Sequence, residues 1–212
     1  MTENDFLDVV QRQVALFSAA PPLQKLKKGD FALADYHRAL LTIFHQVYES
    51  ASTFSLAAAF MESCRCEAKA YLMQHAEEEK LHWRWIISDL RNTGYDGPDP
   101  RTLPPASSAA AYIGYNYYIA LKFPLGRLAI AATLESIGAN FGGPYSARIM
   151  DALKLGADQV VFFRGHGDTD IGHTREIVDV LANAGLTSDE WSSMASIAET
   201  AGALYCSMYE PN

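Results

Sequence analysis

The sequence has few cysteines, few basic residues and no long apolar run free of charge. Three cysteines, Cys64, Cys66 and Cys206, cannot form a disulfide framework, so we expect small core residues or unreactive thiols. No stretch of about 18 apolar residues lacks charged residues, which argues against a membrane-spanning helix. The first residues are acidic, unlike the basic start of a secretory signal. We therefore predict a cytoplasmic protein.

Basic residues are outnumbered by acidic ones, 17 to 25, and the formal net charge is −8. Phosphate binding needs clustered Lys and Arg, and the densest basic stretch is the short run Lys25, Lys27 and Lys28. Nucleic acid is therefore not an expected partner, and neither is a membrane.

Apolar residues recur with helical periodicity along most of the sequence, and few stretches alternate as strands do. The chain has 212 residues, of which 49% are hydrophobic and 20% charged, which is enough to bury one large core. We predict an all-α protein with a single domain over residues 1–212, built as a bundle of about seven helices. Residues 30–208 form the predicted core, and residues 1–29 form an N-terminal helix and a proline-containing linker.

Glycine and proline mark where the predicted helices end. The segment 19–22 contains two prolines and should end the first helix, and residues 94–105 contain four prolines and should form a loop. A break is also expected near Gly165 and Gly167. The predicted helices cover residues 4–18, 34–50, 55–61, 64–92, 107–121, 125–141, 145–154, 157–184 and 187–208.

The first candidate metal-binding stretch lies on the predicted helix 64–92. His75 and His82 are seven residues apart, with Glu78 and Glu79 between them, so these side chains can share one helix face. The spacing Glu79-x-x-His82 is the i, i+3 pair that carboxylate-bridged diiron bundles use. We take Glu79 and His82 as candidate ligands, and keep His75 and Glu78 as additional candidates.

The second stretch has the spacing His-x-x-x-Asp-x-x-His. His166, Asp170 and His173 would form one stripe along a helix. Imidazole and carboxylate donors together suit iron, zinc or manganese. In a helical bundle such ligands come from facing helices and point inward.

Two further candidates lie on apolar helix faces. Glu135 is a lone acid in a nearly uncharged helix, and burying it without a partner would cost several kcal/mol, so a cation is the obvious compensation. His45 lies on or near another apolar face, with Glu49 one turn later. A lone histidine there is more often a hydrogen-bonded core residue than a ligand, so His45 and Glu49 are additional candidates only.

Together these residues resemble the heme-oxygenase-like diiron oxidases and oxygenases, which share a seven-helix fold with heme oxygenase, TenA and PqqC. The family pattern has a Glu on an early core helix, a Glu/His group on the next, a Glu on a later one, and a final His-x-x-x-Asp-x-x-His. The final motif is complete here, and Glu135 lies 31 residues before it. The resemblance covers about residues 30–185. Two positions depart from it, because His45 and His75 stand where carboxylates are expected.

The resemblance implies an O2-dependent oxidase or oxygenase with two irons, whose partner is a small-molecule substrate such as an amino acid, amine or carboxylic acid. Manganese or zinc would also suit the donors. In the implied site, Glu135 bridges the two metals. One metal is bound by His82 with Glu79 or Glu78, and the other by His166, Asp170 and His173.

Substrate-pocket candidates come from a tyrosine-rich stretch and two cations. Tyr112 and Tyr115 could orient a polar substrate, although core or interface packing explains them equally well. Lys122 and Arg164 are candidates for binding a substrate carboxylate.

Three alternatives stay open. A metal-free, TenA-like hydrolase of thiamin-type substrates would need a nucleophilic cysteine in its pocket. A heme-binding protein could use Gly138 and Gly142 to admit the macrocycle and His45 as an axial ligand. A partner-binding protein without enzymatic activity has no positive signal. A homodimer is compatible with a compact helical bundle.

Overall fold

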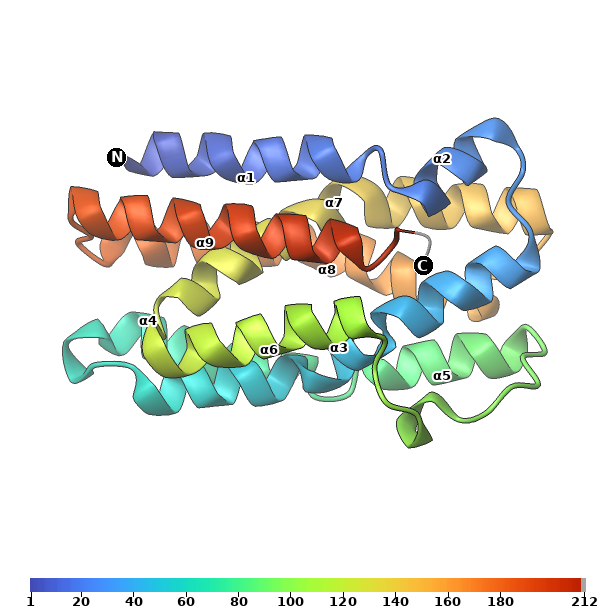
Figure 1. Cartoon of the computed structure of the whole chain (residues 1–212), viewed down its shortest axis with the longest axis horizontal. Helices are drawn as coiled ribbons and strands as arrows, with labels where there is room; N and C mark the ends of the chain where they lie inside the picture. Colours follow the sequence, from blue (N-terminus) through green and yellow to red (C-terminus); the bar gives the residue numbers. More distant parts are fainter. Residues whose placement is uncertain (211–212) are drawn as a thin grey trace.

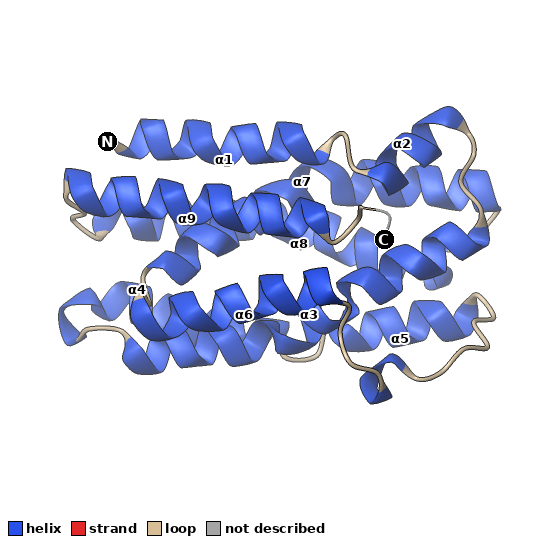
Figure 2. Ribbon diagram, viewed as in Figure 1, coloured by secondary structure: helices blue, strands red, loops and turns tan. Residues whose placement is uncertain are grey.

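The computed structural model describes residues 1–210, and for Asp168 it describes the backbone alone. Within these residues helices connected by loops are the only regular secondary structure, and there is no strand (Figures 1 and 2). Three short 3-10 turns, Ser63–Arg65, Pro100–Thr102 and Ala157–Gln159, lie between longer elements. The α-helices are α1 (Glu3–Phe17), α2 (Pro21–Lys28), α3 (Leu33–Phe60), α4 (Cys66–Glu79), α5 (Trp83–Asn92), α6 (Ser107–Lys122), α7 (Gly126–Leu153), α8 (Val161–Asn183) and α9 (Ser188–Ser207).

The all-α class is therefore confirmed, whereas the predicted number of about seven helices is too low. The expected linker contains α2, because prolines at the first positions of a helix need no amide partner, and Gly29 ends it with a φ of 79°. Two predicted pairs of helices are continuous instead. The long helix α3 spans both 34–50 and 55–61, and α7 runs through Pro144 without a break.

One predicted helix is divided where the histidines lie. The stretch 64–92 contains a turn at residues 80–82, so α4 ends at Glu79 and His82 is the residue before α5. His82 therefore does not continue the face of α4 that carries His75. The break predicted near Gly165 and Gly167 is wrong, because α8 is continuous through both residues.

Glycines allow α7 and α8 to pack closely, and these two helices form the most extensive helix pair. A Cβ atom added at Gly142 would lie 2.8 Å from the Cα atom of Gly167, so neither position has room for a side chain. Around this pair, α1 packs along α9, and α3 packs on α4 and α6 (Figure 1). The close contact fixes the rotation of α8 and thus the direction of its histidines.

The start of α8 is held by a buried carboxylate from α5. Asp89, which is 0% exposed, accepts hydrogen bonds from the backbone amides of Val161 (2.8 Å) and Phe162 (2.9 Å). It also accepts one from the Tyr36 hydroxyl at 3.0 Å. An acceptor at a helix N-terminus satisfies amides that have no partner within the helix. Asp89 thereby fixes the position of α8 relative to α3 and α5.

Candidate metal centre

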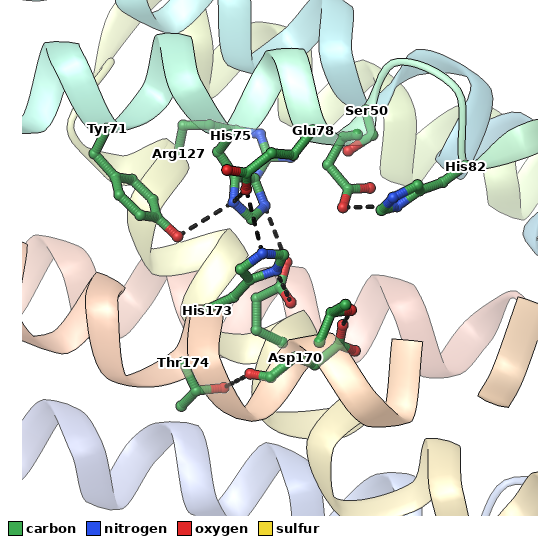
Figure 3. Close-up of polar contacts among 12 residues, drawn as sticks. Ser50, Tyr71, His75, Glu78, His82, Arg127, Asp170, His173 and Thr174 are labelled. Atoms are coloured by element: carbon green, nitrogen blue, oxygen red, sulfur yellow. Dashed lines mark hydrogen bonds and ion pairs between the residues drawn. The ribbon is translucent and has the colours of Figure 1, made fainter. Parts of the chain in front are cut away.

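Imidazole and carboxylate groups from α4, the turn after it, α7 and α8 converge in the interior (Figure 3). They form two groups in which the donor atoms lie within 4.8 Å of one another. The inner group is His75, Glu79, Glu135 and His173, and the outer group is Glu79, His82 and His166. Glu79 belongs to both groups, which makes it the residue that could bridge two ions.

The inner group is centred on Glu135 from α7. His75 Nε2 lies 3.2 Å from Glu135 Oε1, and His173 Nδ1 lies 3.4 Å from Glu135 Oε2. The other nitrogen of His75, Nδ1, lies 3.2 Å from the Tyr71 hydroxyl. On the solvent side, Glu78 Oε2 lies 3.3 Å from His173 Nε2. A histidine held through one nitrogen keeps the other directed at the ion, which is the usual arrangement in metal sites.

The outer group lies between the α4–α5 turn and α8. His82 Nδ1 is 2.9 Å from Glu79 Oε1, and the His82 ring stacks on Trp85 with centroids 4.1 Å apart. His166 Nδ1 lies 3.0 Å from the carbonyl oxygen of Phe162, so it donates its proton there. Its Nε2 is then unprotonated in the neutral ring and available to a cation.

Two imidazole nitrogens in these groups are buried and lack a hydrogen-bond partner within the described residues: Nδ1 of His82 and Nδ1 of His173. Each lies within ion-pair distance of a carboxylate oxygen, but the angles are wrong for a hydrogen bond. Buried polar atoms are nearly always satisfied. A cation placed between nitrogen and carboxylate would satisfy both atoms, so the donor set fits a metal.

The charges of the site also fit a metal. Burial raises the pKa of Asp170 to about 10, helped by the negative charges of Glu135 and Glu79. Burial also acts to raise the pKa of Glu135, but contacts with His173 and His75 outweigh it and the pKa is lowered. Burial lowers the pKa of His166. Carboxylates and histidines crowded in this way are the donors that a divalent cation binds.

Asp170 lies next to this centre without belonging to either donor group. Its side chain is 4% exposed and occupies the space above Gly138, where an added Cβ atom would lie 1.6 Å from Asp170 Oδ2. The predicted stripe of His166, Asp170 and His173 is thus divided, with the two histidines in different groups. Glu79 belongs to both groups, whereas Glu135, for which a bridging role was predicted, belongs to the inner group alone.

The additional candidates from the sequence have different positions. His75 is in the inner group, and Glu78 contacts that group from the surface. His45 and Glu49, on α3, belong to neither group. His45 packs edge-on against Phe44, and Glu49 accepts a hydrogen bond from the Tyr117 hydroxyl.

A cavity of about 100 Å³ adjoins the metal-binding groups. Glu79, Glu135, His166 and Asp170 form part of its wall. Most of the remaining wall is apolar or aromatic, with Ile43, Val47, Phe54, Leu134, Ile137 and Phe162 among the residues. A water molecule needs about 10–15 Å³ by the same measure, so the cavity has room for a small organic molecule.

None of the four predicted pocket residues lines this cavity. Lys122 and Arg164 are exposed, and Tyr115 is half-buried elsewhere on α6. Tyr112 is buried and borders a small void next to the cavity. Gly138 and Gly142 face side-chain and backbone atoms of α8.

Sequence reasoning missed one charged residue on the cavity wall, Arg127, which is 3% exposed. It follows Gly126 and precedes the apolar run Leu-Ala-Ile-Ala-Ala. The argument that singled out Glu135, a lone charge in an apolar helix, applies equally to Arg127 and could have found it.

Comparison with known families agrees with the site. Residues 40–205 match the profile of a family described as iron-containing redox enzymes. The chain belongs to this family. Iron is the metal that the family description names, and imidazole with carboxylate is a donor set that iron accepts. Membership of the iron-containing redox family also confirms the resemblance seen in the sequence.

Solved structures show the same fold. A domain of unknown function with a heme oxygenase-like fold from Shewanella denitrificans has a TM-score of 0.89 at 20% identity, over 99% of this chain and 90% of that one. A TenA homolog from Pseudomonas syringae pv. tomato has a TM-score of 0.78 at 10% identity, over 97% and 90%. Heme oxygenase-1 from the cyanobacterium Synechocystis, in complex with heme, has a TM-score of 0.73 at 12% identity, over 98% and 90%.

At these identities the structural likeness establishes the heme oxygenase-like fold alone. A comparison with curated protein sequences finds no match. None of the helices within residues 1–210 is long and apolar enough to cross a membrane.

Proposed function

We propose that this member of the iron-containing redox family is an O2-dependent non-heme oxidase or oxygenase that binds two irons. The observation that carries the proposal is the pair of donor groups joined by Glu79. In the proposed site, His75, Glu135 and His173 would hold one iron and His82 and His166 the other. Glu79, which belongs to both donor groups, would take the shared role first expected for Glu135.

Two ferrous ions would supply the electrons with which O2 is reduced. The surrounding residues prepare the site for this chemistry. The Phe162 carbonyl and the Tyr71 hydroxyl orient His166 and His75 through the nitrogen that does not face the centre. In the metal-free protein, burial raises the pKa of Asp170 to about 10, so its carboxyl group holds a proton beside the cavity at neutral pH. The apolar wall limits access of water to the reacting groups.

The substrate is proposed to be a small organic molecule, in agreement with the cavity volume of about 100 Å³ and the largely apolar wall. A metal-free hydrolase of the TenA type is less well supported. Cys64 and Cys66 are exposed, Cys206 is half-buried, and none of the three lines the cavity.

The direct test is metal analysis of protein produced with iron and purified without oxygen. We expect about two irons per chain, and a transient visible absorption together with O2 consumption when the loaded protein meets O2. His45→Ala is a matched control, because His45 lies outside both donor groups. Folded protein that binds no iron under these conditions would contradict the proposal.

A further inference from the structure

Arg127, the second residue of α7, carries a buried positive charge. Its Nε donates a hydrogen bond to Thr53 Oγ1 at 3.1 Å, and its guanidinium carbon lies 3.6 Å from the centroid of the Phe54 ring. Within the described residues it forms no ion pair, and its Nη1 is buried without a hydrogen-bond partner. A guanidinium has five N–H donors, so most of its binding capacity is unused.

The charge of Arg127 persists at neutral pH. Burial lowers its pKa to about 10, against the raising effects of Tyr112 and Glu135. A buried charge without a partner is costly, and an apolar residue of similar size would stabilise the fold better. Packing on Phe54 and one hydrogen bond to Thr53 do not account for a guanidinium at this position.

The position of Arg127 connects it to the proposed reaction. Arg127, Glu79 and Glu135 line the same cavity, with apolar side chains making up most of the wall. With two divalent cations bound, the carboxylates of Glu78, Glu79 and Glu135 would be more than balanced, and release of the Asp170 proton would bring the sum to zero. The charge of Arg127 would be in excess in both cases, and a negatively charged ligand would offset it.

We propose that Arg127 anchors the substrate by binding its carboxylate, and that the substrate is a small carboxylic acid whose apolar body fills the cavity beside the metal centre. This inference rests on the proposed function and selects one substrate class within it. A guanidinium binds a carboxylate through two parallel hydrogen bonds, which fixes the orientation of the ligand. An amine fits less well, because the bound metals would neutralise the carboxylates and leave no excess negative charge to bind an ammonium group.

The competing explanation is structural. A void of about 10 Å³ beside Arg127 is also lined by Tyr112, whose hydroxyl is buried without a hydrogen-bond partner in the described part of the chain. That volume holds about one water molecule, which could satisfy both groups. In that case Arg127 would contribute to stability and not to ligand binding, so the two explanations predict different results.

The test measures binding of hexanoate, with hexanamide as the neutral probe of the same shape, to anaerobic iron-loaded protein by calorimetry. The variants are Arg127→Met and Arg127→Lys, and Arg164→Met is the control because Arg164 is exposed. We expect Arg127→Met to weaken hexanoate binding at least about 30-fold, the effect of removing one partner of a buried charged pair. Arg127→Lys should weaken it less, and hexanamide binding should change little.

A stability measurement separates the two explanations. If Arg127 serves binding, the metal-free Arg127→Met protein should have a Tm equal to or above that of the unmodified protein. A lower Tm with unchanged hexanoate affinity overturns the proposal. Iron-loaded protein that binds hexanoate no better than hexanamide also overturns it, while the proposed iron chemistry stands. Failure to bind iron overturns the proposed function and this inference with it.

Discussion

Helix α8 passes two buried carboxylate clusters that differ in how their polar atoms are satisfied. At its start, Asp89 accepts hydrogen bonds from two backbone amides and from Tyr36. In its middle, Asp170 lies beside Glu135 and Glu79, and two nearby histidine nitrogens have no hydrogen-bond partner among the residues that the structure describes. The first cluster is completed by the protein itself and serves stability. The second is the proposed metal centre, because its polar atoms are left unsatisfied by folding and fit a cation.

The largest effect is expected from removing the shared carboxylate. Glu79→Ala should reduce iron from about two to less than one per chain, because both donor groups lose a ligand. Iron analysis of anaerobically purified protein measures this. Glu77→Ala is the matched control, since Glu77 is exposed on the same helix and forms an ion pair with Lys80. Retention of two irons by Glu79→Ala would show that the two groups are independent of this residue.

The next largest effect tests the other cluster. Asp89→Ala should lower the free energy of unfolding by about 3–5 kcal/mol, because two amides at the start of α8 and the Tyr36 hydroxyl lose a buried acceptor. Urea unfolding of the metal-free protein measures this. Asp151→Ala, which removes an exposed pair with Lys154, should change stability by no more than about 0.5 kcal/mol. Equal effects of the two substitutions would mean that Asp89 contributes no more to stability than an exposed ion pair does.

A smaller effect is expected in the pH dependence of the metal-free protein. The pKa of Asp170 rises on folding from its ordinary 3.8 to about 10, because of burial and the charges of Glu135 and Glu79. The folded protein therefore keeps a proton that the unfolded chain releases above pH about 4, and stability falls as pH rises toward 10. One such proton corresponds to about 1.4 kcal/mol per pH unit.

His173 acts in the same direction, because contact with Glu135 outweighs burial and raises its pKa to about 8. Its contribution is complete below pH about 6.5 and is lost as pH rises through 8. The free energy of unfolding, measured with urea at pH 7, 8 and 9, should thus fall as pH rises. Asp170→Asn should make this fall shallower by about 1.4 kcal/mol per pH unit, the contribution of one proton. Parallel slopes for the two proteins would contradict the assignment of a protonated Asp170.

The smallest effect concerns a residue behind the centre. Tyr71→Phe removes the hydroxyl that lies 3.2 Å from His75 Nδ1 and should weaken iron binding about tenfold, as losses of outer contacts at metal sites do. Competition with a chelator measures the affinity. Tyr117→Phe is the control, because its hydroxyl bonds to Glu49 away from both donor groups. A similar loss in both variants would mean that the effect is not specific to His75.

Much of this architecture follows from local sequence. Helical periodicity predicts the all-α class, and the lone Glu135 in an apolar helix predicts a compensated buried charge. The histidines at 75, 82, 166 and 173 were each recognisable from spacing along a helix. Arg127 is likewise a lone charge in an apolar helix, so the same argument could have identified it from the sequence.

Spacing along the sequence did not predict which donors lie in the same group. Spacing rules assume a straight helix, whereas the chain turns at residues 80–82, which moves His82 off the face of α4 and leaves Glu79 between the two groups. The sequence alone thus determined which residues have metal-binding chemistry and that most of them lie on helices. Tertiary structure decided which of them share a donor group, because the close packing of α7 on α8 at Gly142 and Gly167 sets the rotation of each helix. Rotation depends on contacts between residues far apart in the chain, and no local pattern encodes it.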